Sequence, residues 1–138
     1  MSGEPGVSLV RAGELTSRVP YAYAAVTPPG WLVFTAGACP LDTAGETVAP
    51  GDVAAQTAQV MDNLEVALHA AGAELRDVAK TTVYVASDRR EDLLTAWSVV
   101  HDRFGDHDVP STLLGVASLG YPDQFVEVEA VAAIPAIR

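Results

Sequence analysis

The sequence predicts an α+β fold, in which two amphipathic helices interrupt the strands of a mixed β-sheet. Segments 51–72 and 88–105 place apolar residues at intervals of three and four, the period of a helix with one buried face. Short runs rich in β-branched and aromatic residues lie before, between and after these segments. The elements therefore follow the order strand, strand, helix, strand, helix, strand, strand (ββαβαββ).

The first two strands are expected to form a hairpin. Tyr21–Thr27 and Trp31–Ala36 read as strands, and Pro28-Pro29-Gly30 between them reads as a turn. A shorter apolar–polar stretch, Val7–Arg11, precedes them. Residues 37–50 are rich in proline, glycine and aspartate, so they form a loop long enough to be functional.

The two helices carry recognisable start and stop signals. Gly51 or Asp52 starts the first helix, and Gly72 ends it. Ser87 or Asp88 caps the second helix, and Gly105 closes it. Helices inserted between the strands of a mixed sheet usually lie on one face, which leaves the other face in need of cover. This arrangement predicts an oligomer.

Three further strands are expected at 78–86, 111–117 and 125–134, and the last alternates most regularly. One of its faces holds Val126, Val128, Ala130, Ala132 and Ile134. The other holds Phe125, Glu127, Glu129, Val131 and Ala133. Because two carboxylates there have apolar neighbours, this second face is expected to line a crevice or an interface.

Composition limits the function further. The 138 residues fit one domain, 1–138, and 49% of them are hydrophobic against 19% charged. A net charge of −10 disfavours nucleic acid and anionic membranes as partners. The first residues lack a basic and an apolar leader region, and no apolar run reaches membrane-spanning length. With a single cysteine, Cys39, a cytoplasmic protein is expected.

The familiar cofactor and metal motifs are absent from the sequence. It has no Walker A loop, no G-x-G-x-x-G, no C-x-x-C and no H-E-x-x-H, so neither a cofactor nor a metal is expected. Acidic and histidine residues do gather near the end of the second helix, but their irregular spacing fits a solvated helix end better: His101, Asp102, Asp106, His107 and Asp108.

Five side chains are candidates for chemistry, each with a structural alternative. Glu127 and Glu129 lie on an apolar strand face, where a partly buried carboxylate can hold a water or take a proton, or simply accept structural hydrogen bonds. Lys80, the only lysine, is a Schiff-base candidate or an exposed side chain beside Thr82. Cys39 is a possible nucleophile, but nothing near it in sequence lowers its pKa. Trp97 most simply belongs to the core.

Several short motifs, in this order, resemble the RidA/YjgF family from about Pro20 to Ile134. The matching segments are 20–21, 33–42, Gln56, 63–64, 70–73, 77–85, Phe104, Pro110 and 126–132. The resemblance implies a chorismate-mutase-like fold assembled as a homotrimer, with small-molecule sites in clefts between subunits. It also implies hydrolysis of enamines and imines, such as 2-aminoacrylate, to 2-keto acids and ammonia without a metal or cofactor.

The resemblance also assigns site residues. The family's water-activating acid matches Glu127, and its site tyrosine matches Tyr21. The arginine of its P-x-R motif, which grips the substrate carboxylate, is replaced by Thr112, so the chain falls in a subgroup that lacks this arginine. Further candidate substrate-binding positions are Ala36, Gly37, Cys39 and Trp97, with Ala36, Ala38 and Trp97 standing where serine, glutamine and asparagine are frequent.

These departures leave two functions open, beside a purely structural trimer that would hold no ligand in the cleft. The first is a RidA-like hydrolase or tailoring enzyme for a less anionic imine, enamine or related carbonyl metabolite, with Glu127, Tyr21 and Thr112 as catalytic residues. Such an enzyme differs from a standard 2-aminoacrylate deaminase because a neutral hydroxyl supplies neither the charge nor the fork of an arginine. The second is a trimer that binds a metabolite in the same clefts without turnover.

Overall fold

The computed structural model describes residues 6–136; the first five residues, on which part of the leader expectation rests, lie outside this range. Within it the order is β1 (Ser8–Val10), β2 (Ala24–Val26), β3 (Gly30–Phe34), α1 (Val53–Ala70), the short 3₁₀ helix η1 (Leu75–Asp77), β4 (Val78–Val85), α2 (Arg90–Phe104), β5 (Ser111–Gly115) and β6 (Val126–Pro135). From β2 onward this is the predicted ββαβαββ order, so the α+β fold class is confirmed.

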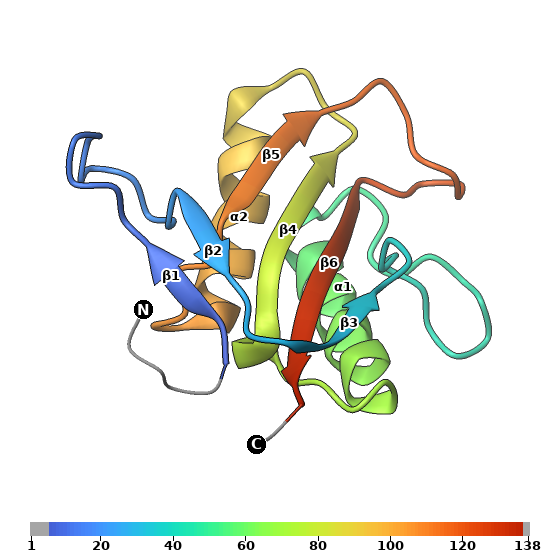
Figure 1. Ribbon diagram of the computed structural model, residues 1–138. Helices are drawn as coiled ribbons and strands as arrows, with labels where there is room; N and C mark the ends of the chain where they lie inside the picture. Colours follow the sequence, from blue (N-terminus) through green and yellow to red (C-terminus); the bar gives the residue numbers. More distant parts are fainter. Residues whose placement is uncertain (1–5, 137–138) are drawn as a thin grey trace.

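The main sheet has the strand order β3-β6-β4-β5. Strand β6 is antiparallel to both β3 and β4, whereas β4 and β5 are parallel, so the sheet is mixed as predicted. Helix α1 packs on β6, and α2 packs on β4 and β5. Figure 1 shows both helices behind the sheet, which confirms that they cover one face and leave the other open.

The predicted hairpin between the first two strands is wrong. Strand β2 pairs with β1 in a separate two-stranded sheet, and β3 pairs with β6. Pro28 and Pro29 have no N–H groups and cannot continue a ladder between β2 and β3. Gly30 instead lies so close to β6 that a Cβ atom on it would be 2.1 Å from the carbonyl oxygen of Ile134.

Both helices end where the sequence predicts, but only the first helix also begins at the predicted residue. The side chain of Asp52 caps α1 by accepting a hydrogen bond from Ala55 N at 2.9 Å. The cap of α2 is Arg89, one residue beyond the predicted positions. Ser87 still supports this turn, because its hydroxyl accepts from Arg89 N and donates to Asp92.

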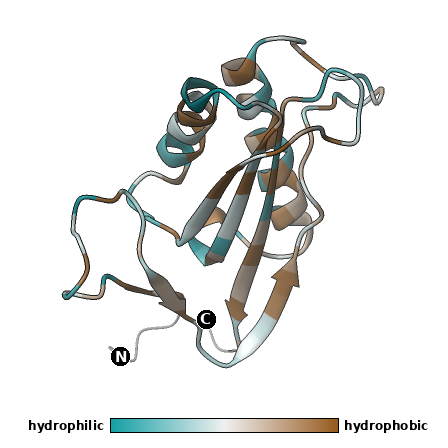
Figure 2. Cartoon of the chain, turned by 90° about the horizontal axis from the view of Figure 1, so that it is seen from above, coloured by the Kyte–Doolittle hydropathy of each residue, from teal (hydrophilic) through white to brown (hydrophobic). Residues whose placement is uncertain are grey.

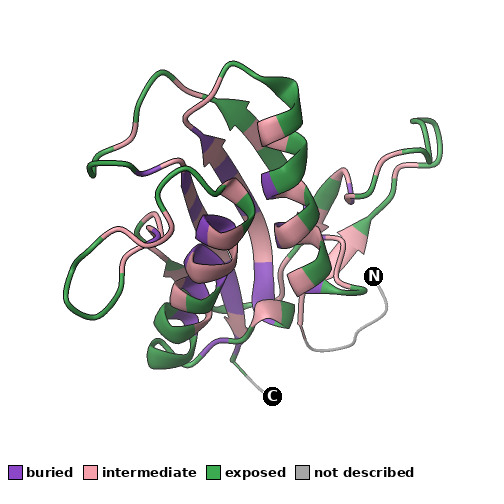
Figure 3. Ribbon diagram, turned by 180° about the vertical axis from the view of Figure 1, so that it is seen from behind, coloured by how far each residue is buried: buried purple, intermediate pink, exposed green. Residues whose placement is uncertain are grey.

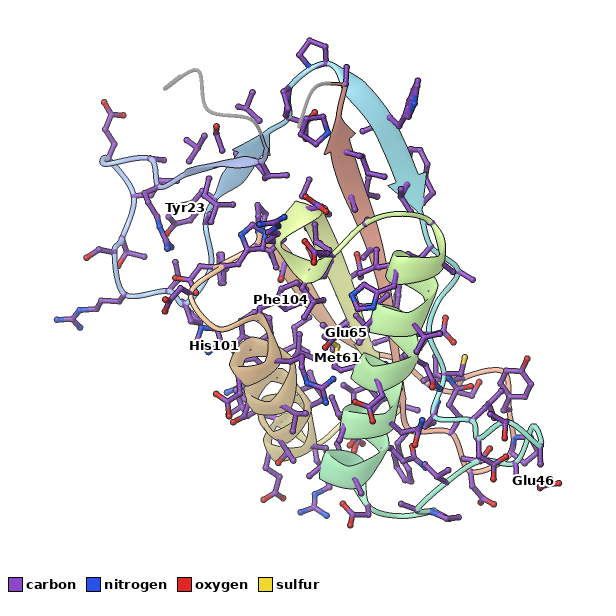
Figure 4. The ribbon with its side chains drawn as sticks, turned by 90° about the horizontal axis from the view of Figure 1, so that it is seen from below. Tyr23, Glu46, Met61, Glu65, His101 and Phe104 are labelled. Atoms are coloured by element: carbon purple, nitrogen blue, oxygen red, sulfur yellow. The ribbon has the colours of Figure 1, made fainter. Side chains whose placement is uncertain are left out.

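The core lies between the two helices and the covered face of the sheet. Figure 3 shows the buried residues on the inner sides of these elements, and Figure 4 shows Met61 and Phe104 pointing between the helices and the strands. The largest fully buried apolar side chains are Met61, Leu64, Leu68, Val60, Val78, Val83, Val85, Val100, Val126 and Val128. This cluster fixes which face of β6 looks inward.

The predicted alternation along β6 holds over most of its length. Val126, Val128, Ala130 and Ala132 are buried, while Glu127, Glu129 and Val131 between them are partly exposed. Beyond Ala132 the alternation fails, because Ala133 is also buried and Ile134 is not. The register between β4 and β6 shifts at the same place, where Val78 and Lys80 pair with adjacent residues of β6.

The open face of the sheet combines apolar and charged side chains. Leu32, Phe34 and Leu114 are exposed there, and 72% of Phe34 is accessible to solvent. The hydropathy colouring in Figure 2 marks β3 as an apolar strand at the edge of the sheet. In the described part of the chain, no helix has both the length and the apolar character needed to cross a membrane.

Helix α1 allows a direct test of the core. Leu64 is fully buried, whereas Val66, two residues further along the same helix, is 68% exposed. We expect Leu64→Ala to lower the free energy of unfolding by about 2–5 kcal/mol, because the substitution removes buried carbon and leaves a cavity. Val66→Ala is the matched control, with an expected change below about 0.5 kcal/mol. Urea unfolding at one protein concentration measures both, and equal losses would contradict the assigned core.

Candidate functional site

The carboxylate of Glu127 is held in a small cup formed by two loops. Its Oε1 atom accepts hydrogen bonds from Gln124 Nε2 at 3.1 Å and from Cys39 Sγ at 3.3 Å. The other oxygen, Oε2, faces Gly37: a Cβ atom at that glycine would lie only 2.1 Å away. A glycine at position 37 is therefore required for this carboxylate position.

The segment 36–39 is anchored to β6 by backbone pairing. Ala38 N donates to Val128 O at 2.8 Å, and Val128 N donates to Ala38 O at 3.2 Å. Asn63 of α1 donates through Nδ2 to the carbonyl oxygens of Cys39 and Leu41. Strand β6 and helix α1 thus fix this loop from two sides.

The segment before β6 is anchored by two buried glutamines. Gln56 of α1 donates to the carbonyl oxygens of Val48 and Asp123 and accepts from Phe125 N. Gln124 accepts from Tyr121 N at 3.0 Å while its amide nitrogen reaches Glu127. The sequence analysis did not identify Gln124 as a site residue. The one signal for it in the sequence is its place as a polar residue immediately before an apolar strand.

Cys39 behaves as a hydrogen-bond donor in this cup. Burial, the hydrogen bond to Glu127 and the negative charge of that carboxylate together raise the pKa of the Cys39 thiol to about 11. The thiol therefore stays protonated at neutral pH, which disfavours Cys39 as a nucleophile.

A second group of predicted site residues lines a pocket beside the edge strand β5. This pocket has a volume of about 500 Å³, and its lining residues are Pro20, Tyr21, Leu94, Trp97, Ser111, Thr112 and Leu113. The core residues of α2 are Ala96, Val100 and Phe104, whereas Trp97 is partly exposed. The expectation that Trp97 is simply a core residue is therefore wrong. Trp97 follows Ala96 by one residue, which turns its side chain away from the centre of the buried helix face.

Lys80 also differs from the expectation of an exposed side chain beside Thr82. It is partly buried, and its Nζ atom donates to Thr112 Oγ1 at 2.7 Å. The sequence gives little signal for this contact, because it depends on the parallel pairing of β4 with β5, in which Thr82 lies opposite Thr112.

The structure thus brings the predicted residues together in two groups. Glu127, Cys39, Gly37 and the adjacent Ala36 lie where the chain leaves β3, whereas Thr112 belongs to β5, at the opposite edge of the sheet. Tyr21 and Trp97 join Thr112. In Figure 4, Glu46 of the loop after Cys39 and Tyr23 beside Tyr21 lie on opposite sides of the molecule.

The residues near the end of α2 are engaged in structural contacts. Asp108 pairs with Arg11 at 2.6 Å and with His101 at 3.3 Å, and His107 Nε2 lies 2.7 Å from Val78 O. Among residues 6–136, no group of three or more histidine, cysteine or acidic side chains is arranged to hold a metal ion.

The chain has the same α+β fold as solved structures of YjgF and Rid proteins. A Rid family protein of unknown function from Yersinia pestis superposes with a TM-score of 0.86 at 28% identity, covering 94% of this chain and 99% of its own. The YjgF gene product of Escherichia coli gives a TM-score of 0.64 at 31% identity, covering 91% and 98%.

Sequence comparison agrees. Residues 12–134 match the family described as Endoribonuclease L-PSP, and the chain belongs to this RidA/YjgF/RutC family. A RutC family protein from Pyrococcus horikoshii is 33% identical over 110 residues, which cover 80% of this chain and 85% of the relative. The 2-iminobutanoate/2-iminopropanoate deaminase of E. coli is 33% identical over 106 residues, covering 75% and 80%.

The thiol chemistry of Cys39 is open to measurement. With its pKa at about 11, labelling by a thiol reagent should be slow at pH 7 and should rise about tenfold per pH unit up to that value. Glu127→Gln removes the negative charge that helps to raise the pKa, so it should speed labelling at pH 8. Unfolded protein in urea provides the rate for a fully accessible thiol. Equally fast labelling of folded and unfolded protein at pH 7 would contradict the cup geometry.

Proposed function

We propose that this protein is a RidA-like enzyme of small-molecule metabolism, acting in the cytoplasm on an imine, an enamine or a related carbonyl metabolite. The observation that supports this function most directly is the Glu127 carboxylate, in which Oε1 is held by two donors and Oε2 is left to accept from a water. The named activity of the E. coli relative, an iminobutanoate and iminopropanoate deaminase, supports the same class of reaction.

In the proposed reaction, water adds to the carbon of the C=N bond. Glu127 takes a proton from the attacking water and returns it to the nitrogen, which gives a carbinolamine. It then transfers the hydroxyl proton to the amine, so that the C–N bond breaks, C=O forms and ammonia leaves. An enamine first gains a proton on carbon and loses one from nitrogen to give the imine. Water is the only co-reactant, so the reaction needs neither an oxidant nor a cofactor.

We propose that the reaction takes place in a cleft between subunits of a homotrimer, with residues 1–138 acting as one domain. The open sheet face exposes Leu32, Phe34 and Leu114, an apolar area of the kind that subunit interfaces cover. The two groups of predicted residues lie toward opposite edges of the sheet, so contact between neighbouring subunits is a way to combine Glu127 of one with Tyr21 and Thr112 of the next.

The pocket residues then select the substrate. Tyr21 and Thr112 present hydroxyl groups to the reacting atoms, and Trp97 with Ala36 supplies apolar surface. Because Thr112 lacks a guanidinium fork, we propose a substrate other than the one a standard 2-aminoacrylate deaminase binds in a bidentate manner.

A small-molecule substrate is favoured over RNA, despite the endoribonuclease description of the family. A chain with eight basic and eighteen acidic residues repels a phosphate backbone, and phosphate contacts supply most of the affinity in nucleic-acid binding.

The alternative function is a trimer that binds a metabolite without turnover. It is favoured by the neutral residues Thr112, Ala36 and Ala38, at positions where the family resemblance implies polar or charged groups. Ammonia release from a panel of neutral and carboxylate-bearing imines separates the two functions, since a binding protein releases none above the uncatalysed rate.

The homotrimer is a direct prediction. Light scattering at micromolar concentration should give a mass three times that of the 14.4 kDa chain. Phe34→Glu places a charge on the exposed apolar edge and should shift the population toward single chains. Glu46→Lys, at an exposed loop position, is the control and should leave the mass unchanged. A native protein of 14.4 kDa would contradict the proposed cleft.

The role of Glu127 is tested by Glu127→Gln. The amide keeps the size of the side chain but cannot take a proton from water, so kcat for imine hydrolysis should fall about a hundredfold or more. Ammonia release is the measurement, with light scattering to verify the assembly. The control is Glu46→Gln, an exposed carboxylate with expected native turnover. Native turnover in Glu127→Gln would move the chemistry to another residue.

A further inference from the structure

We propose that Lys80 forms an anion-binding subsite with Thr112, so that the substrate carries a carboxylate held by a lysine instead of an arginine. This inference rests on the proposed function, because it concerns the substrate of the same cleft. It also revises the expectation of a less anionic substrate, which considered position 112 alone.

The register of the sheet explains why Lys80 reaches Thr112. Thr82 lies opposite Thr112 in the parallel pair β4–β5, and Lys80 is two residues before Thr82 on the same face of β4. The lysine side chain extends along the strand until its Nζ atom donates to Thr112 Oγ1 at 2.7 Å. Thr112 must be neutral for this contact, since a guanidinium in its place would repel the ammonium.

The charge of Lys80 is not neutralised by an ion pair in the described chain. Salt bridges in residues 6–136 engage Arg11, Arg76, Arg89, Arg103 and His101, but not Lys80. Glu129, the carboxylate opposite Thr82 on the neighbouring strand, instead accepts a hydrogen bond from the Tyr84 hydroxyl at 2.6 Å. In a chain with a net charge of −10, an ammonium with no salt-bridge partner among residues 6–136 is suited to an external anion.

Each member of the Lys80–Thr112 pair lines a hollow in the surface. Lys80 lines a hollow of about 190 Å³ together with Phe34, Thr82 and Glu129. Its partner Thr112 lines the pocket of about 500 Å³ that also contains Tyr21. An ammonium has three N–H donors, and the bond to Thr112 uses one, so two remain for a carboxylate.

The chemistry of lysine defines what this subsite selects. An ammonium is a compact charge without the planar fork of arginine, so it requires a negative charge but not one orientation of the carboxylate. We therefore expect preference for a carboxylate over its neutral amide, with tolerance of different substituents beside it.

The experiment uses the fact that Lys80 is the only lysine of the sequence. Full-length protein labelled with ¹³C at the lysine Cε gives one lysine side-chain NMR signal, which reports on this residue alone. The probes are 2-oxobutanoate and its neutral amide, 2-oxobutanamide. We expect 2-oxobutanoate to shift the signal in a saturable manner, with a Kd at least about tenfold lower than that of the amide.

Variants connect this preference to the ammonium. By calorimetry, Lys80→Met should bind 2-oxobutanoate about tenfold more weakly while its affinity for the amide stays the same, and Lys80→Arg should keep the preference for the carboxylate. Arg89→Met removes the same charge from an exposed, salt-bridged arginine beyond the other end of β4, and it should behave as the native protein. Circular dichroism verifies that each variant is folded.

Three outcomes would overturn the subsite: equal affinity of the native protein for the acid and the amide, undiminished preference in Lys80→Met, or no saturable binding of 2-oxobutanoate. Ammonia release separates this inference from the proposed function. A carboxylate preference that depends on Lys80, without hydrolysis of any imine, supports the subsite and overturns only the enzymatic activity.

Discussion

The alternation of side chains along β6 is the constraint on which the other features depend. This strand lies between β3 and β4, so its buried face meets α1 while its other face carries Glu127 and Glu129. A shift of one residue in its register would turn both carboxylates into the apolar core and expose the valines and alanines. Ionised groups in such a core are costly, which makes the observed register strongly favoured. The position of the carboxylate is thus set by the same packing that holds the sheet together.

Two amide side chains of α1, the buried Gln56 and the half-buried Asn63, extend this positional control from the core to the loops. Gln56 and Asn63, both on α1, bind backbone groups on the two sides of the Glu127 cup. A buried amide that lacks partners destabilises the fold, so each pair of hydrogen bonds favours one loop conformation. In the described chain no buried side-chain nitrogen or oxygen lacks a hydrogen-bond partner.

The sequence predicts the local structure well because periodicity and caps are local signals. Asp52, Gly72 and Gly105 mark helix ends, and the β6 alternation is visible from Val126 to Ala132. The strand that pairs with β3 cannot be identified from local signals, because it is distant in the sequence. Proximity in sequence predicted β2, but the partner is β6.

For the candidate site, single residue types could be recognised but not their contacts. Glu127 is visible as a carboxylate among apolar residues, and the grouping of Tyr21 with Thr112 follows from the family resemblance. The donors to Glu127 and the reach of Lys80 to Thr112 depend on loop paths and on strand register, which join residues 88 and 32 positions apart. Sequence patterns over short windows contain no information on such pairs.

The contact between Gly37 and the Glu127 carboxylate has a consequence for how this site can diverge. Any other amino acid at position 37 would displace the acid from its present position, so this position resists change as long as the acid is used there. Ala36, the residue before it, is exposed and can take a larger or polar side chain, whereas Ala38, the residue after it, packs against the core. New substrate preferences can therefore accumulate around an unchanged carboxylate, and a lineage can exchange substrates without rebuilding its proton acceptor.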